Sequence, residues 1–182
     1  MQKKLNITFI YVTHDQEEAM TMSDRVAIMS EGLILQIDKP MEIYNRPTTR
    51  FVADFIGESN IFEGVVENKV GDTLYVRTPS GSCIVNGPEF EVNEKIFVSV
   101  RPEYMMIDEK PIEDFTLKAT MTDLVYMGTL AKAILSTADG HEIKYSRFEL
   151  GSMLDIGKEV YLYWNPEKAV AIKQDTMNER TV

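Results

Sequence analysis

The sequence predicts an α+β protein in two parts, a mixed helix-and-strand segment over residues 1–58 and an all-β domain over residues 59–182. Three observations lead to this prediction. One continuous apolar run near the N-terminus precedes a helix-capping signal. After residue 58, short apolar stretches alternate with glycine-containing turns. The length of 182 residues, divided by roughly 150 residues per domain, allows one large or two small domains.

The first segment opens with the run Ile7–Val12, which is apolar, β-branched and aromatic almost throughout. Such a run predicts a strand buried on both faces, as in a parallel sheet. Asp15 then predicts a helix N-terminus, because Glu18 follows three residues later as in a capping box. We expect this helix to end near Ser23–Asp24.

A hairpin and two short helices complete the first segment. The apolar runs 25–30 and 33–37 flank Glu31-Gly32, a two-residue turn with glycine where a positive φ is needed. A proline then opens a predicted helix over residues 41–45, and a second helix is expected over residues 49–56. This segment cannot form a complete α/β domain, because its single buried strand lacks neighbours. We expect a partner chain or a further N-terminal portion to complete it, and we expect its apolar surface to favour self-association.

The second part contains ten short strand patterns separated by turns. Gly71-Asp72 and Asp139-Gly140 are typical hairpin turns, and the close spacing of the strands predicts small barrels. The expected strands cover residues 61–69, 73–78, 82–85, 95–101, 104–108, 115–126, 129–137, 142–146, 159–164 and 169–173.

An internal similarity suggests that the β part is duplicated. Residues 94–107 can be laid over residues 158–171, since both contain a charge pair, an alternating strand, an x-Pro-Glu turn and a second apolar strand. The alternative is a chance similarity between two β-rich stretches. Both turn prolines are interpreted as strand terminators. Arg101 and Glu103, on either side of the first proline, are expected to form a surface ion pair of little energetic weight.

Composition excludes several classes of protein. There are 19 basic and 29 acidic residues, a net charge of −10, which argues against nucleic-acid binding because phosphate contacts need a basic face. The single cysteine, Cys83, excludes an intrachain disulfide and favours a reducing compartment. No run of about 18 apolar residues is present, so no direct membrane insertion is expected. His14, His141 and Cys83 lack the spacing of a metal site, and none is predicted.

His14 lies between the expected strand and the expected helix, at the edge where open α/β sheets bind ligands. A lone histidine there can equally be an exposed loop residue. The surrounding string, however, resembles the switch-histidine region of ABC importer ATPases. The resemblance covers residues 7–20, 23–25, 29–32, 40–44 and 51–57, together with Asn60.

This resemblance, to the group that imports carbohydrates and polyamines, implies both the fold and the chemistry. Residues 1–58 would be the C-terminal remnant of an α/β P-loop ATPase domain, and residues 59–182 a TOBE regulatory domain of small OB-like barrels. His14 would be the catalytic switch histidine, which hydrogen-bonds the ATP γ-phosphate in the complete subunit, with ATP and Mg²⁺ as cofactors there. Asp15 and Glu18 are interpreted as structural caps. The expected partners are a second copy of the chain and the membrane-spanning permease subunits, at the cytoplasmic face of the cell membrane.

The rest of the ATPase machinery is missing from the sequence. There is no G-x-x-x-x-G-K-[ST] phosphate loop, no Ser-Gly-Gly-Gln-type signature, and no strand ending in Asp-Glu ahead of His14 to hold magnesium and supply a base. We therefore expect this chain by itself neither to bind nor to hydrolyse ATP, and to need no cofactor. The alternative function is a stand-alone, non-enzymatic β module that binds a ligand or dimerises.

Overall fold

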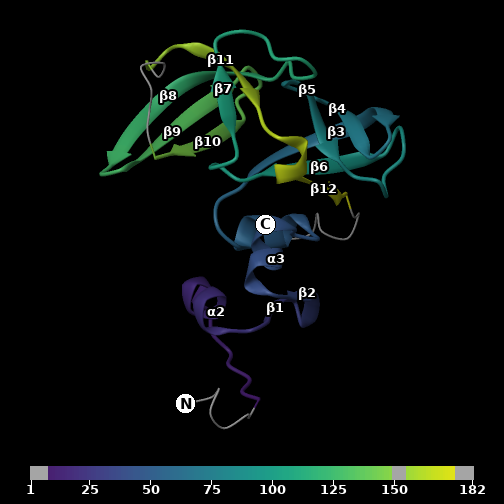
Figure 1. Ribbon diagram of the computed structural model, residues 1–182, viewed down its shortest axis with the longest axis vertical. Coiled ribbons are helices and arrows are strands. Elements are labelled where there is room, and N and C mark those ends of the chain that lie inside the picture. The colour runs from purple at the N-terminus through teal and green to yellow at the C-terminus, as the bar shows by residue number, and fades with distance from the viewer. Residues whose placement is uncertain (1–7, 149–154, 175–182) are drawn as a thin grey trace.

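The computed structural model describes residues 8–148 and 155–174 of the chain (Figure 1). These residues are mostly β-sheet with few helices, arranged as one two-stranded and two five-stranded sheets. The N-terminal hairpin forms one end of the molecule and the two five-stranded sheets form the other, with helix α3 (Pro40–Asn45) between them (Figure 1).

The predicted N-terminal strand is not formed. Residues 8–13 have no regular secondary structure, and Phe9, Ile10 and Val12 are 63%, 92% and 89% exposed. The prediction of a buried strand is therefore wrong for residues 8–12, and Ile7 lies outside the described residues. The physical reason is the lack of neighbours, because the described chain places no strand beside this segment to pair with its backbone.

The helices and the hairpin of the first segment form close to their predicted positions. Helix α2 (Gln16–Met22) is followed by strands β1 (Val26–Ser30) and β2 (Leu33–Asp38), whose turn has the two positive φ angles that the hairpin requires. Helices α3 (Pro40–Asn45) and α4 (Arg50–Phe55) come next. They pack on the hairpin through a small buried cluster made of Val26, Ile28, Ile43, Val52 and Ile56.

The β part forms two antiparallel sheets, and we call residues 60–173 the β domain. The first sheet has the order β12-β6-β3-β4-β5 and the second the order β10-β9-β8-β11-β7. The strands are β3 (Asn60–Val70), β4 (Thr73–Thr78), β5 (Gly81–Asn86), β6 (Lys95–Val100), β7 (Met106–Asp108), β8 (Lys118–Met127), β9 (Leu130–Thr137), β10 (Glu142–Arg147), β11 (Glu159–Tyr163) and β12 (Ala169–Lys173). The predicted strands over 104–108 and 115–126 thus begin later than expected, because residues 101–105 and 112–115 form turns that use local backbone hydrogen bonds.

The two sheets confirm the predicted duplication and add an exchange of strands. Strands β3 to β6 build one unit and β8 to β11 the other, but each unit is completed by the last strand of its neighbour: β12 pairs with β6, and β7 pairs with β11. The registers match, since Val170 pairs with Ser99 and the equivalent Met106 pairs with Tyr163.

Fine details of the two units repeat as well. A bulge separates Val66 from Asn68 in β3, and an equivalent bulge separates Met121 from Asp123 in β8. At each bulge the backbone N–H donates to the residue that precedes the unit's fourth strand, from Val66 to Glu94 at 2.9 Å and from Met121 to Lys158 at 3.0 Å. A chance similarity would not reproduce a bulge together with its hydrogen bond, so the β domain contains two copies of one unit.

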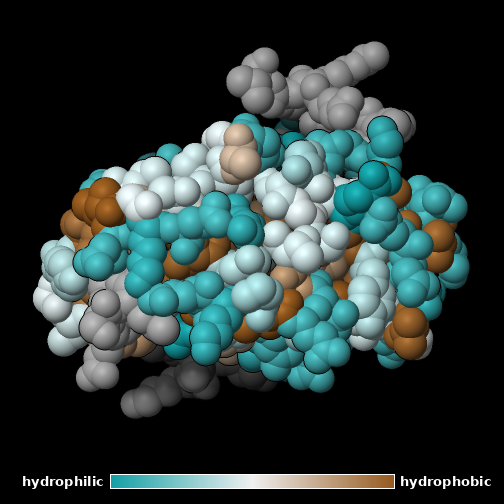
Figure 2. Space-filling model, turned by 90° about the horizontal axis from the view of Figure 1, so that it is seen from above, coloured by the Kyte–Doolittle hydropathy of each residue, from teal (hydrophilic) through white to brown (hydrophobic). Residues whose placement is uncertain are grey.

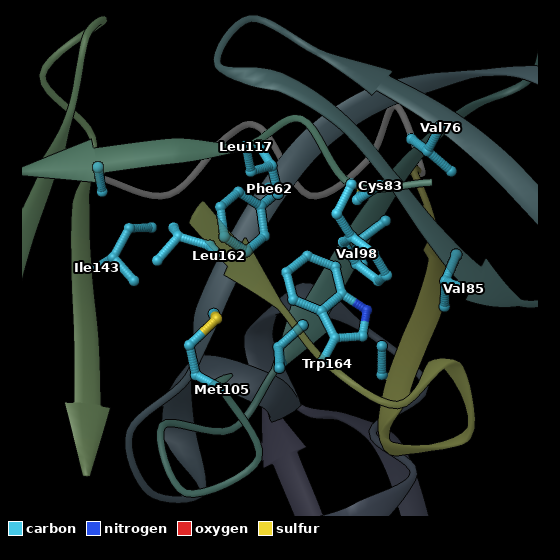
Figure 3. Packing of buried hydrophobic residues seen from close by; sticks show 14 of the residues in the cluster. Phe62, Val76, Cys83, Val85, Val98, Met105, Leu117, Ile143, Leu162 and Trp164 are labelled. Carbon is cyan, nitrogen blue, oxygen red and sulfur yellow. The ribbon is translucent and has the colours of Figure 1, made fainter. Parts of the chain in front are cut away.

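One continuous core holds the two units together. Trp164 is buried at the end of β11 and stacks on Phe62 of β3 at 5.5 Å (Figure 3). The ring of Phe115 meets the indole edge-on at 5.0 Å. Its indole N–H donates to the carbonyl oxygen of Ile84 at 2.9 Å. The alternation in β11 is as predicted, with Leu162 and Trp164 in the core.

Candidate functional site

The predicted switch histidine lies in the loop before helix α2. His14 directly precedes Asp15, whose carboxylate accepts a hydrogen bond from the backbone N–H of Glu18 at 3.1 Å and so caps the seven-residue helix. The predicted cap is confirmed for Asp15. Glu18 does not complete the capping box, because its carboxylate instead accepts from the hydroxyls of Tyr11 at 3.0 Å and Thr13 at 3.2 Å.

These hydrogen bonds fix the loop and leave the imidazole free. The Thr13 hydroxyl also accepts from the backbone N–H of Asp15 at 2.9 Å, so the backbone on both sides of His14 is held while its side chain is exposed. The contact with Glu18 raises the pKa of Tyr11. An exposed imidazole beside a helix N-terminus can donate a hydrogen bond to an anion. Separately, the described residues contain no group of three or more His, Cys, Asp or Glu side chains placed to hold a metal ion.

A second group of functional interest joins the N-terminal elements to the β domain. Arg101, immediately after β6, is 4% exposed. Its guanidinium donates four hydrogen bonds, each to a backbone carbonyl oxygen. Nη1 donates to Ala53 at 3.0 Å and Glu58 at 3.1 Å, while Nη2 and Nε donate to Tyr44 at 2.8 and 3.2 Å. Its guanidinium carbon also lies 4.2 Å from the centroid of the Tyr44 ring. Burial lowers the pKa of Arg101 from its very high ordinary value.

The predicted ion pair between Arg101 and Glu103 is therefore wrong. Glu103 accepts a hydrogen bond from the Tyr44 hydroxyl at 2.6 Å, and burial together with this contact raises the pKa of Tyr44. Sequence reasoning missed the joint because the partners of Arg101 are backbone carbonyls, which carry no side-chain signal. One signal was available: the second unit has Asn165 where the first has Arg101, so the turn itself does not need arginine.

Two hydroxyl-lined pockets of about 220 and 210 Å³ share Ser80 in their lining, at a contact between the two units. The contact is a hydrogen bond of 2.6 Å from the Ser80 hydroxyl to the carboxylate of Asp139. The larger pocket has the pair of Lys118 and Glu159 in its lining, and His141 lines the smaller one, where its ring stacks on Phe62 at 5.6 Å. Sequence reasoning found neither pocket.

The surface of the β domain at the end far from the N-terminus is predominantly hydrophilic, with hydrophobic side chains in separate small patches (Figure 2). Within the described ranges, no helix is long and apolar enough to cross a membrane.

Comparison with known proteins finds one matching domain and a group of similar proteins. Residues 98–172 match the TOBE domain. The chain is 44% identical over 144 residues to the spermidine/putrescine import ATP-binding protein PotA of Rubrobacter xylanophilus, covering 77% of this chain and 38% of that protein. It is 40% identical over 167 residues to the protein of the same name from Borreliella afzelii, covering 92% of this chain and 45% of that one. The matches fall in the C-terminal portion of these relatives.

The chain is therefore similar to the C-terminal portion of import ATP-binding proteins of this kind. It spans about half the length, or less, of the relatives it matches. The TOBE match begins inside β6 and ends inside β12, so it covers the end of β6, strand β7 and all of strands β8 to β11.

Among solved structures, the chain is similar to the cytoplasmic molybdate-binding protein ModG, crystallised with molybdate bound. That similarity has a TM-score of 0.47 and 12% sequence identity, and it covers 69% of this chain and 97% of that one.

Proposed function

We propose that this chain forms the C-terminal part of the ATP-hydrolysing subunit of an ABC importer for polyamines. The observation that carries the proposal is the sequence similarity to spermidine/putrescine import ATP-binding proteins, which extends through the His14 loop and the β domain alike. On this proposal, residues 1–58 are the end of a P-loop ATPase domain, and the β domain is its regulatory and dimerising part, built of small OB-like barrels.

His14 is the catalytic residue we assign to this part of the subunit. In phosphoryl transfer, charge spreads over the γ-phosphoryl oxygens, and a positioned imidazole N–H stabilises it. The loop suits that role, because Asp15 and Thr13 fix the backbone on either side while the His14 ring remains accessible. The phosphate loop and the Mg²⁺ ligands would come from the rest of the complete subunit.

Exposed apolar surface supports the proposed partners. Phe9, Ile10 and Val12 project into solvent without a neighbouring strand, and an exposed apolar segment of this kind is stable when another element covers it. We propose that the remainder of the ATPase domain covers it in the complete subunit. That subunit would then dimerise and dock on permease subunits at the cytoplasmic face of the membrane.

Calorimetry with Mg·ATP tests the first consequence of this proposal. The chain alone should give no measurable heat of binding, because His14 contacts one end of a triphosphate and the phosphate loop is absent from its sequence. Binding in the micromolar range would overturn the proposal that the rest of the subunit is required.

A chimera tests the role of His14 itself. This chain would replace the corresponding C-terminal part of the Rubrobacter xylanophilus relative, and ATP hydrolysis and ATP binding would be measured separately. His14→Ala should lower the hydrolysis rate by about a hundredfold or more, the usual loss when a transition-state donor is removed, with ATP binding changed far less. Glu17→Gln, in the first turn of α2, is the matched control and should retain activity. Equal rates for the His14→Ala and control chimeras would refute the assignment.

The stand-alone β module remains the second candidate, favoured by the core of the β domain, which is larger than and distinct from that of the N-terminal elements. An inactive but folded wild-type chimera, together with a monodisperse dimer of the chain alone, would favour this candidate.

A further inference from the structure

The joint between the N-terminal elements and the β domain depends on helix ends. We call residues 40–58, which contain α3 and α4, the helical segment. The last carbonyl groups of a helix have no partner within the helix and must find one elsewhere. Tyr44 lies in the last turn of α3 and Ala53 in the last turn of α4, and both carbonyl oxygens point at the same guanidinium, that of Arg101.

We propose that Arg101 is a C-cap contributed by the β domain and shared by α3 and α4, and that it fixes the helical segment against the β domain. The planar fork of a guanidinium donates in several fixed directions at once, so one side chain can satisfy carbonyls that come from two different helices. Its positive charge also suits the negative end of both helix dipoles. The third acceptor, the carbonyl of Glu58, lies in the connection that leads into β3.

The duplication shows that Arg101 is not needed to build the β domain. The same x-Pro-Glu turn follows β6 and β11, with Arg101 in the first copy and Asn165 in the second. Asn165 is exposed, and its side chain accepts from the backbone N–H of Glu167 at 3.0 Å within its own turn. Since the turn forms without arginine in one copy, the arginine of the other copy serves the contact that is unique to that copy, the one with the helical segment.

A buried apolar contact among Ala53, Phe97 and Ile172 also crosses the joint, but the other polar contacts across it lie nearer the surface. The Tyr44 hydroxyl donates to Glu103, Tyr104 donates to Asn45 at 3.3 Å, and Lys132 pairs with Glu58 at 3.1 Å. The last pair is solvent-exposed and contributes little. Arg101 is the buried side chain among these polar contacts, and its removal would leave carbonyl groups inside the joint without a partner.

Hydrogen exchange measured by mass spectrometry on the full 182-residue chain tests this role. Arg101→Asn places the residue of the second copy in the first, so the turn should still form. Amides of residues 40–58 should then exchange at least about tenfold faster, since carbonyls left unsatisfied favour local opening. Amides in strands β3 to β12 should change by less than about twofold. Arg101→Lys keeps the charge without the fork and should give an intermediate increase.

Arg50→Ala is the matched control. Arg50 is also at the joint, where it lies over the Phe97 ring at 5.1 Å and pairs with Asp54 at 3.6 Å, but it caps neither helix. Its loss should leave exchange in residues 40–58 within about twofold of the wild type. The proposal would be overturned by unchanged exchange in the Arg101→Asn variant, by an equal increase in the β strands, or by the same increase in the Arg50→Ala variant. This role of Arg101 concerns the chain's own fold and holds whatever the complete protein transports.

Discussion

Replacing Trp164 with phenylalanine should weaken the whole β domain and not one sheet alone. The indole is 2% exposed and contacts Phe62 and Phe115, and its N–H donates to Ile84 in β5 of the other unit. Phenylalanine keeps most of the ring contact but leaves the Ile84 carbonyl without its donor, which costs about 1–3 kcal/mol. The smaller ring adds roughly 1 kcal/mol for the space it leaves, so the free energy of unfolding should fall by about 2–4 kcal/mol.

Urea unfolding followed by far-ultraviolet circular dichroism measures this change, because the variant lacks the chain's single tryptophan as a fluorophore. The matched control is Tyr163→Phe, one residue earlier, where the ring is half-buried and its contact with Phe115 survives the substitution. That variant should stay within about 0.5 kcal/mol of the wild type. A loss below 1 kcal/mol for Trp164→Phe, or a loss equal to that of the control, would refute the reasoning.

Two further predictions follow from the charge and burial of single groups. The hydroxyls of Ser80 and Thr137 donate to Asp139 and lower its pKa, so Asp139→Asn should reduce the melting temperature at neutral pH. The difference in melting temperature between variant and wild type should shrink as the pH falls below about 4 and through the lowered pKa of Asp139. A difference that is unchanged at about pH 2 would contradict this. Burial raises the pKa of Cys83 to about 12. A thiol reagent at about pH 8 should therefore label the native chain no faster than the chain unfolds. Rapid labelling without denaturant would show that β5 is not packed as described.

Structural elements that depend on nearby residues were predicted correctly from the sequence, whereas features that depend on distant residues were not. The hairpin over β1 and β2 forms as predicted because Glu31-Gly32 determines the turn within a few residues. The run 7–12 has an equally strong pattern and forms no strand over its described residues, because a strand is stabilised by neighbours that sequence periodicity does not supply. A pattern therefore predicts what a segment can become, and the neighbouring elements determine whether it does.

The same distinction between nearby and distant partners applies to the residues of the candidate site. Asp15 was predicted as a cap because its acceptor role depends on a backbone N–H three residues away. Arg101 was misassigned because its partners, Tyr44, Ala53 and Glu58, lie more than forty residues earlier and act through their carbonyls. An acidic neighbour in the sequence, Glu103, suggested an ion pair that the fold does not make. Comparing the two copies of the repeat would have been the better guide, since a residue that differs between equivalent turns points to a contact made by one copy alone.

The exchange of last strands determines what can fold as a unit. Strand β6 pairs with β3 on one side and with β12 on the other, and β12 comes from the second copy. Strand β7, from the first copy, completes the sheet of the second. Neither copy can therefore close its own sheet, and the unit needs all the strands from β3 to β12. The domain match over residues 98–172 marks the recognisable sequence, but a fragment with those bounds would lack β3, β4 and β5. It would therefore lose two of the three partners of Trp164, Phe62 and Ile84. Arg101 follows directly after β6, the strand through which the two copies are connected, so the joint attaches the helical segment to the β domain beside that strand.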